Sequence, residues 1–205
     1  MIDANEYLEA GLRLHGHKCP AMPMGLRAGA AAMNQLGVAR AKDKELSAVV
    51  ELGDDHCSHC FADGIQVVTG CTFGKGNLKK SGYGKFGVTL VDRASGHAVR
   101  IVPKAEAQTK MKETSFFLEY RMKGVPPSRV PDTVVDPLIR QVMGAPEEAI
   151  LTVGRPFPMD PGKPAETFAS FVCARCGETV VEKYGRIVGE QKVCIPCQEK
   201  FLAGE

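Results

Sequence analysis

The amino-acid sequence predicts an α+β fold, with a core of packed helices on a mostly antiparallel sheet and a small C-terminal zinc ribbon. Helix-like and strand-like segments alternate irregularly, which favours α+β over a doubly wound parallel sheet. Two β-branched runs flank the turn-forming stretch from Asp92 to Gly96, a pattern typical of a β-hairpin. Two Cys-x-x-Cys pairs near the C-terminus predict the ribbon.

The first half of the chain is predicted to hold an N-terminal helix, an alanine-rich helix, a buried strand and a short helix. Their expected ranges are 5–16, 25–37, 46–52 and 61–70. The alanine-rich helix should end at Gly37, because glycine readily adopts the left-handed conformation that closes a helix. A glycine-rich loop should follow at 70–77.

The second half is predicted to continue with the hairpin, a long amphipathic helix, another helix and a last strand. Their expected ranges are 84–102, 104–124, 133–144 and 145–154, with Pro146 opening a helical turn in the last of them. Four prolines between Arg155 and Glu166 predict a semi-rigid linker. The expected domains are therefore a core over 1–154, a linker over 155–166 and a ribbon over 167–205.

Composition sets broad limits on the class of protein. A chain of 205 residues suits one medium domain with a small appendage. No apolar run reaches the roughly 18 residues of a membrane span, and the N-terminus lacks the basic and apolar regions of a signal peptide. We therefore expect a cytoplasmic protein that does not enter a membrane. In that compartment the eight cysteines indicate metal ligands or reactive thiols before disulfides.

The C-terminal cysteines have the spacing of a four-thiolate zinc site. The ligands would be Cys173, Cys176, Cys194 and Cys197. A segment of under about forty residues buries too little apolar surface to fold alone, so the metal would supply the missing stability. An iron–sulfur centre and redox-active cysteine pairs are the alternatives. Basic and acidic residues balance from Cys173 onward, which argues against nucleic acid as a partner and favours a protein contact.

Two further segments, "HGHKCP" at 15–20 and "DDHCSHC" at 54–60, concentrate histidines and cysteines. If the first segment is extended, alternate side chains point the same way, so His17 and Cys19 can share an ion or a substrate pocket. In the second, Cys57 and Cys60 have knuckle spacing, and Asp63 lies one helical turn after Cys60. The alternative is that each cysteine is a small buried apolar residue.

These two segments are predicted to meet in space and form a second metal site in the core. His17 and Cys60 are the first expected ligands, Cys57 an additional one, and Cys19 either a ligand or the reactive thiol beside the ion. Thiolate and imidazole together suit zinc or another transition metal. Lys75, in the glycine-rich loop, would attract an anionic substrate, although the loop can equally be a simple tight turn. The candidate catalytic residues are Cys19, Asp63 and Lys75.

Three blocks between Tyr7 and Asp92 together resemble the E-subunit family of molybdenum or tungsten formylmethanofuran dehydrogenase. The blocks are "HGHKCPAMPMGLRAG", "CFADGIQVVTGCTFGKGNL" and "YGKFGVTLVD". Some members of that family also carry a C-terminal zinc ribbon. The resemblance implies a dimeric α+β core with a metal-capable cleft. The residues carried over by their positions in the motifs are His17, Cys19, Cys60, Asp63, Gln66, Cys71, Thr72 and Lys75.

The leading hypothesis for the function is a metal-binding protein related to this E-subunit family. It would be an accessory subunit or component of one-carbon or redox metabolism, and a homodimer with a possible molybdenum or tungsten enzyme as partner. One alternative is a free-standing enzyme that depends on a thiol or a metal. Another is a metal-sensing module for assembly or regulation. The sequence leaves open whether the protein is catalytic by itself.

Overall fold

The computed structural model describes residues 1–54, 59–163 and 167–204. The chain divides into two compact units, Met1–Gly162 and Lys163–Glu205. No helix in the described ranges is long and apolar enough to cross a membrane.

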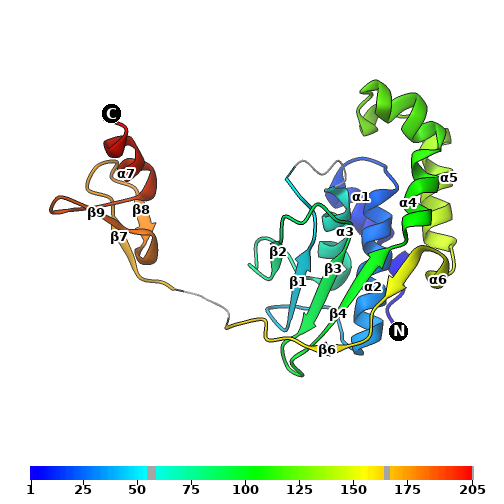
Figure 1. Ribbon diagram of the computed structural model, residues 1–205, viewed down its shortest axis with the longest axis horizontal. Coiled ribbons are helices and arrows are strands. Elements are labelled where there is room, and N and C mark those ends of the chain that lie inside the picture. The colour runs from blue at the N-terminus through cyan, green and yellow to red at the C-terminus, as the bar shows by residue number, and fades with distance from the viewer. Residues whose placement is uncertain (55–58, 164–166, 205) are drawn as a thin grey trace. The chain divides into compact units, whose positions relative to one another are not determined.

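The first unit is built on a six-stranded sheet in the order β2-β1-β3-β4-β5, with β6 pairing to β4 beside β5 (Figure 1). The strands are β1 (Leu46–Val50), β2 (Leu78–Lys80), β3 (Val88–Asp92), β4 (His97–Pro103), β5 (Leu151–Val153) and β6 (Phe157–Pro158). Only β1 and β2 are parallel, and the other pairs are antiparallel. The predicted hairpin is confirmed, with Asp92 opposite His97.

Helices cover the sheet, and the alanine-rich helix α2 packs against several of the others. They are α1 (Leu8–His15), α2 (Ala21–Leu36), α3 (Cys60–Thr69), α4 (Ala105–Lys112), α5 (Asp132–Gly144) and α6 (Glu147–Ile150), with a 3-10 turn η1 at Ala4–Tyr7. Helix α2 packs on β3, β4 and β5 with one side and on α3 with another. It ends, as predicted, at Gly37, whose φ of 67° is left-handed. Together these elements confirm the α+β class.

Helices α2 and α3 approach each other unusually closely. A Cβ atom added at Gly25 would lie 2.1 Å from the carbonyl oxygen of Phe61, and one added at Gly64 would lie 2.2 Å from that of Met22. Only glycine fits at such a distance between two backbones. This contact holds the N-terminal ends of the two helices together, and both ends carry cysteines of the candidate site.

The predicted helix over 104–124 is wrong as one continuous element. Helix α4 ends at Lys112, and a π-helical turn η2 (Phe116–Tyr120) and a 3-10 turn η3 (Arg121–Lys123) follow. The hydroxyl of Thr114 donates to the carbonyl oxygen of Met111 at 2.7 Å. Such a side-chain bond competes with regular helical bonding, which accounts for the change of helix type at this position.

The first part of the predicted linker also belongs to the core sheet. Phe157 and Pro158 form β6, opposite Ala98 and His97 of β4. The backbone N–H of Met159 then donates to the carbonyl oxygen of Gly96 at 2.9 Å. Proline is compatible with a strand of this kind because it lies at an edge, where its missing N–H is not needed.

The second unit contains two short hairpins and a helix. Its elements are β7 (Ser170–Val172), β8 (Thr179–Val181), a 3-10 turn η5 (Glu182–Tyr184), β9 (Arg186–Val188), β10 (Gln191–Val193) and α7 (Ile195–Leu202). Strand β7 pairs with β8 and β9 with β10, both antiparallel. The buried cluster of this unit consists of Cys173, Val193 and Cys194. So small an apolar centre agrees with a fold that a metal completes.

Candidate metal centres

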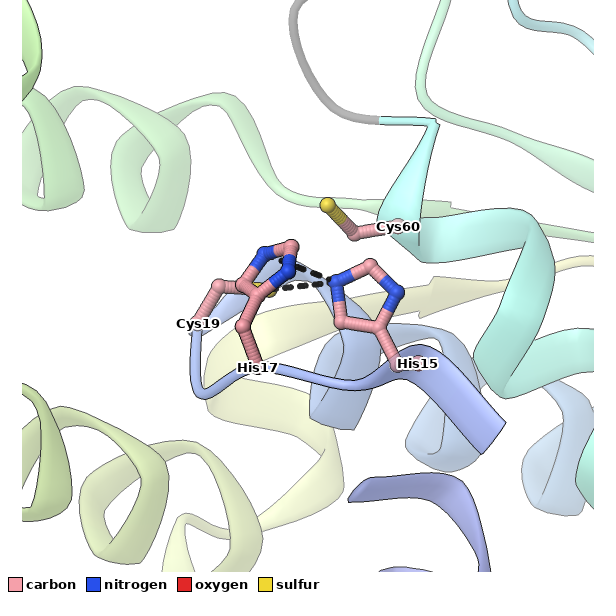
Figure 2. Close-up of side chains that lie close together, drawn as sticks. All are labelled: His15, His17, Cys19 and Cys60. Atoms are coloured by element: carbon pink, nitrogen blue, oxygen red, sulfur yellow. Dashed lines mark hydrogen bonds between the residues drawn. The ribbon is translucent and has the colours of Figure 1, made fainter. Parts of the chain in front are cut away.

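The first candidate centre lies where α1 ends and α2 begins. Helix α1 ends at His15, because Gly16 takes a left-handed φ of 81° and turns the chain away. His17 and Cys19 follow before α2 starts at Ala21. Figure 2 shows these side chains on one short segment, with Cys60 reaching the same spot from the start of α3. Two segments far apart in the sequence therefore meet, as the motifs predict.

The ligand atoms are spaced as a single ion requires. One atom each from His15, His17, Cys19 and Cys60 lies within 4.8 Å of all the others. The two Nε2 atoms of His15 and His17 are 3.0 Å apart, and the Sγ of Cys19 is 3.5 Å from Nε2 of His15. Around a tetrahedral zinc ion two nitrogens lie about 3.3 Å apart, and nitrogen and sulfur about 3.6 Å. The residues present fit such an ion without large movement.

Asp63 orients His15 toward the cluster. Nδ1 of His15 lies 2.7 Å from Oδ2 of Asp63, and a carboxylate only accepts hydrogen bonds, so Nδ1 carries the proton. Nε2, on the other side of the ring, then presents its lone pair to the neighbouring ligands. A carboxylate behind a histidine is the usual support of a metal-binding imidazole. Asp63, expected from the sequence to be catalytic, thus contacts the ring of a ligand instead of pointing at the cluster.

A further hydrogen bond ties this carboxylate to the glycine-rich loop. Gln66 donates from Nε2 to Oδ1 of Asp63 at 3.2 Å, and its Oε1 accepts the backbone N–H of Phe73 at 3.1 Å. Both oxygens of Asp63 are therefore engaged, one by His15 and one by Gln66. The relay fixes the carboxylate and connects the position of His15 to that of the loop.

The local electrostatics favour the metal-binding forms of Cys19 and His17, whereas Cys60 keeps its proton until an ion displaces it. A hydrogen bond from the Cys60 thiol lowers the pKa of Cys19, although Cys19 is buried. The same bond, together with burial, raises the pKa of Cys60. Burial, followed by the charges of His15 and Arg121, lowers the pKa of His17. A thiolate at Cys19 and a neutral imidazole at His17 are the protonation states required of metal ligands.

Lys18, between the two ligands His17 and Cys19, anchors the segment to α5. Its Nζ lies 2.8 Å from a carboxylate oxygen of Asp132 and 2.8 Å from one of Asp136. The side chain therefore points away from the cluster and holds the turn in place. The positive charge is satisfied at the helix rather than added to the metal site.

The other predicted residues lie apart from this centre. Lys75 donates from Nζ to the carbonyl oxygens of Ala41 and Lys42, at 3.2 and 3.1 Å, so it holds the glycine-rich loop to the chain before β1. Its role as an anion-binding residue stays a prediction that this position does not favour. Cys71 is buried in the core, and burial raises its pKa to about 11. Cys57, the predicted additional ligand, lies outside the described residues.

His15 is a candidate ligand that the sequence hypothesis did not include. Its alternation with His17 and Cys19 was the available signal, since residues two apart share a direction on an extended segment. In the structure the three side chains also converge, but not on one extended segment. His15 still belongs to a helix, and only the residues after Gly16 leave it.

A cavity of about 330 Å³ opens next to the two sulfurs of the centre. Cys19 and Cys60 form part of its wall, and most of the rest is apolar. Its other walls come from the start of α2, from α4 and from the turns η2 and η3. The thiol side of the centre therefore faces a space large enough for a small molecule.

The second candidate centre is the C-terminal cluster of Cys173, Cys176, Cys194 and Cys197. Its four sulfurs lie within 4.8 Å of one another, and those of Cys176 and Cys194 are 3.9 Å apart. Sulfurs around a tetrahedral zinc ion lie about 3.8 Å apart. The backbone N–H of Cys194 donates to the sulfur of Cys173 at 3.2 Å. Hydrogen bonds from the backbone of Cys176, and then of Cys194, lower the pKa of Cys173 to about 6.

Comparison with known proteins identifies the family of the C-terminal unit. The model of the C4-type zinc finger of prokaryotic dksA/traR proteins matches residues 166–201. The C-terminal unit thus carries the cysteine cluster of a zinc finger, which supports the expected zinc.

Similar proteins give a wider context. A probable S-adenosyl-L-methionine-binding protein of Archaeoglobus fulgidus is 38% identical over 97 residues, which is 45% of this chain and 25% of that protein. This chain thus spans about a quarter of the length of that relative. The crystal structure of a protein from Syntrophus aciditrophicus that is like FmdE, the E subunit of tungsten formylmethanofuran dehydrogenase, has a TM-score of 0.64 and 24% identity. That match covers 95% of this chain and 91% of the other, and it confirms the fold.

The core is matched along most of its length by one family model. That model, FmdE, of the molybdenum formylmethanofuran dehydrogenase operon, covers residues 14–152, which include every residue of the first centre. The match extends over more than half of the chain and confirms the resemblance seen in its motifs. The chain is a member of the FmdE family, with a zinc-finger unit at its C-terminus.

Proposed function

We propose that the core binds one transition-metal ion, zinc in the first place, through His15, His17, Cys19 and Cys60. The observation that carries this proposal is the convergence of four ligand atoms, two imidazole nitrogens and two sulfurs, from two distant segments. A bound zinc ion would stabilise the two thiolates. The C-terminal cluster binds a second, structural zinc ion.

The metal site is the part of the protein that would serve one-carbon or redox metabolism. The support is membership of the FmdE family together with a cavity that reaches the sulfurs of Cys19 and Cys60. With all four positions taken by side chains the ion is held in a closed site. A small molecule entering from the cavity would meet the two sulfurs before it met either histidine ring.

The assembly that we propose is a cytoplasmic homodimer that works beside a molybdenum or tungsten oxidoreductase. Family membership is its main support. Light scattering on the full-length protein should give about twice the chain mass of 22.1 kDa. A monomer at micromolar concentration would remove the dimer. If the protein is isolated from native cells without any such oxidoreductase, the proposed partnership is refuted.

The second candidate function is a free-standing enzyme that depends on the metal or on a thiol. The cavity beside Cys19 favours it, because an accessory subunit needs no cavity for a small molecule. Such an enzyme would act on its ligand without a second protein. An accessory subunit would act only when its partner enzyme is present.

Metal analysis of matched variants tests the core site. The wild-type protein should hold two ions per chain, one for each four-ligand cluster. The double variant His17→Ala with Cys60→Ala should hold one ion, since two of four ligands are removed. The matched control is His97→Ala with Cys71→Ala, which removes a histidine and a cysteine that lie outside both clusters. The control should keep two ions. An unchanged metal content in the first double variant would refute the core site.

A further inference from the structure

We infer that the cavity beside the core centre binds a small carboxylate with an apolar body. The carboxylate would pair with the guanidinium group of Arg121, and the body would lie among Met24, Met111 and Phe116, all of which line the cavity. This inference deepens the proposed function and rests on it, because Cys19 and Cys60 of the proposed metal site line the same cavity.

The change of helix type after α4 builds this cavity. Lining residues lie at Ala107, Met111, Phe116 and Arg121, with spacings of four, five and five residues. Residues five apart in an α-helix lie about 140° apart around the axis, so a continuous helix could not turn them all to one side. A π-helical turn accommodates about one extra residue. The backbone N–H of Arg121 donates to the carbonyl oxygens of Phe116 and Phe117, and the first of these is an i→i−5 bond.

The charged side chains of the cavity wall favour an anionic ligand. Arg121 and Lys112 line the cavity, and no acidic side chain does so among the described residues. Neither cation has a carboxylate partner within the described part of the chain. Arg121 is held in place by a bond from Nη1 to the carbonyl oxygen of Val125, which leaves its other donors for a ligand. Its charge also acts on His17, so the guanidinium lies within electrostatic reach of the metal site.

Size and polarity restrict the rest of the ligand. A volume of about 330 Å³ lies at the small end of ligand pockets, which span about 300 to 1,000 Å³. It suits a molecule of roughly ten non-hydrogen atoms, at about 30 Å³ for each water-sized group. Three methionines, Met24, Met111 and Met122, line the space, and their flexible side chains adapt to apolar groups of different shape.

Calorimetric titration with a matched pair of probes tests the inference on the full-length, metal-loaded protein. The probes are 3-phenylpropionate and its neutral analogue 3-phenylpropan-1-ol, which share the apolar body and differ in charge. We expect saturable 1:1 binding of the acid, and binding of the alcohol that is weaker by about 10-fold or more. Equal binding of both probes, or no saturable binding of the acid, would overturn the inference.

Variants locate the binding. Arg121→Gln should weaken the binding of the acid by about 10-fold or more, whereas Arg121→Lys should retain most of the affinity. The matched control is Arg155→Gln, which changes an exposed arginine that does not line the cavity and should bind as wild type. Wild-type affinity in Arg121→Gln would contradict the proposed contact. A thermal melt of each variant identifies any loss of fold. Met111→Gln changes the apolar wall and leaves the charge in place, so it should weaken the binding of both probes alike.

Metal content measured on the same samples separates this inference from the proposed function. If the core holds its ion and the acid does not bind, the inference fails and the metal site stands. If the acid binds with the expected charge dependence but the core holds no ion, the metal site fails and the anion pocket stands.

Discussion

The two candidate metal centres offer similar ligand atoms on very different supports. The C-terminal cysteines surround the centre of a unit whose buried cluster is Cys173, Val193 and Cys194. The N-terminal candidate ligands instead adjoin a large core, which includes Cys19 and buries side chains such as Met22, Leu26 and Phe61 completely. A metal ion at the first cluster would replace an apolar core, and an ion at the second would bind to a core that already exists. The same loss of metal should therefore unfold one unit and leave the other folded.

The largest expected effect is the loss of the C-terminal fold in Cys176→Ser. Structural zinc contributes about 10 to 16 kcal/mol of binding free energy in small zinc modules, far more than this unit can gain from its few buried side chains. Hydrogen exchange should show β7 to α7 unprotected while the core sheet keeps its protection. Ser170→Ala, an exposed change in β7, is the control and should leave both units protected. Loss of protection in the core as well would mean that the two units do not fold independently.

A smaller but still large effect is expected at the contact between α2 and α3. Gly25→Ala places a Cβ atom against the backbone of Phe61, which must move to avoid a separation of 2.1 Å. Overpacking of this kind costs about 1 to 3 kcal/mol or more, and the helix shift should also separate Cys60 from His17. Chemical denaturation and metal analysis should show lower core stability and a weaker core ion. Gly144→Ala, where an added Cβ meets nothing within 4 Å, should change neither quantity appreciably.

A third, intermediate effect concerns the core centre alone. Asp63→Asn removes the carboxylate that orients His15, and loss of such a supporting group costs about 10 to 100-fold in metal affinity. Competition with a chelator should show this loss at the core ion and no change at the C-terminal one. Asp43→Asn, an exposed carboxylate outside both clusters, serves as the control. A core ion held as tightly as in the wild type would contradict this role of Asp63, and urea unfolding of the metal-free variant separates a loss of support for His15 from a loss of core stability.

The smallest expected effect lies in the β3–β4 hairpin. Asp92 accepts hydrogen bonds from the backbone N–H groups of Ala94 and Ser95, and hydrogen bonds from the Ser95 side chain and then from these groups lower its pKa. Asp92→Ala should cost the core about 0.5 to 1 kcal/mol, because solvent screens a carboxylate this exposed. Urea unfolding at neutral pH measures it. The C-terminal unit should not respond.

The direction of the pH dependence at Asp92 follows from the lowered pKa. The folded value lies below the unfolded value of 3.8, so the stabilisation is complete above pH 3.8 and is lost as the pH falls through the folded value. The difference in stability between wild type and Asp92→Ala should therefore shrink only in strong acid. A difference that shrinks near neutral pH would assign the effect to another group.

Local patterns were enough to predict much of the molecule. The hairpin, the end of α2 at Gly37 and the ligands of the C-terminal cluster all depend on residues close together in the sequence, and the structure agrees with each. The break after α4 was missed, because apolar periodicity does not reveal a π-helical turn. Two residues of the predicted linker entered the sheet through long-range pairing with β4.

The core centre was predicted in part. The two motifs that meet there were recognised, but His15 was not among the predicted ligands, and the predicted additional ligand Cys57 lies outside the described residues. Asp63 and Lys75 were predicted to be catalytic. Those roles stay predictions. In the structure the carboxylate of Asp63 contacts His15, and Lys75 bonds to the chain before β1. Such assignments depend on which way a side chain points after helices α1, α2 and α3 have packed. That packing rests on glycine contacts whose partners are remote in the sequence.

Anomalous X-ray diffraction at the zinc absorption edge, on crystals of the protein grown with zinc, tests the core centre most directly. Two peaks per chain are expected. One should lie among the four cysteine sulfurs, and the other about 2.0 Å from Nε2 of His15 and His17 and about 2.3 Å from Sγ of Cys19 and Cys60. A single peak at the C-terminal cluster, with the side chains of the core cluster ordered and free of metal, would contradict a metal site in the core.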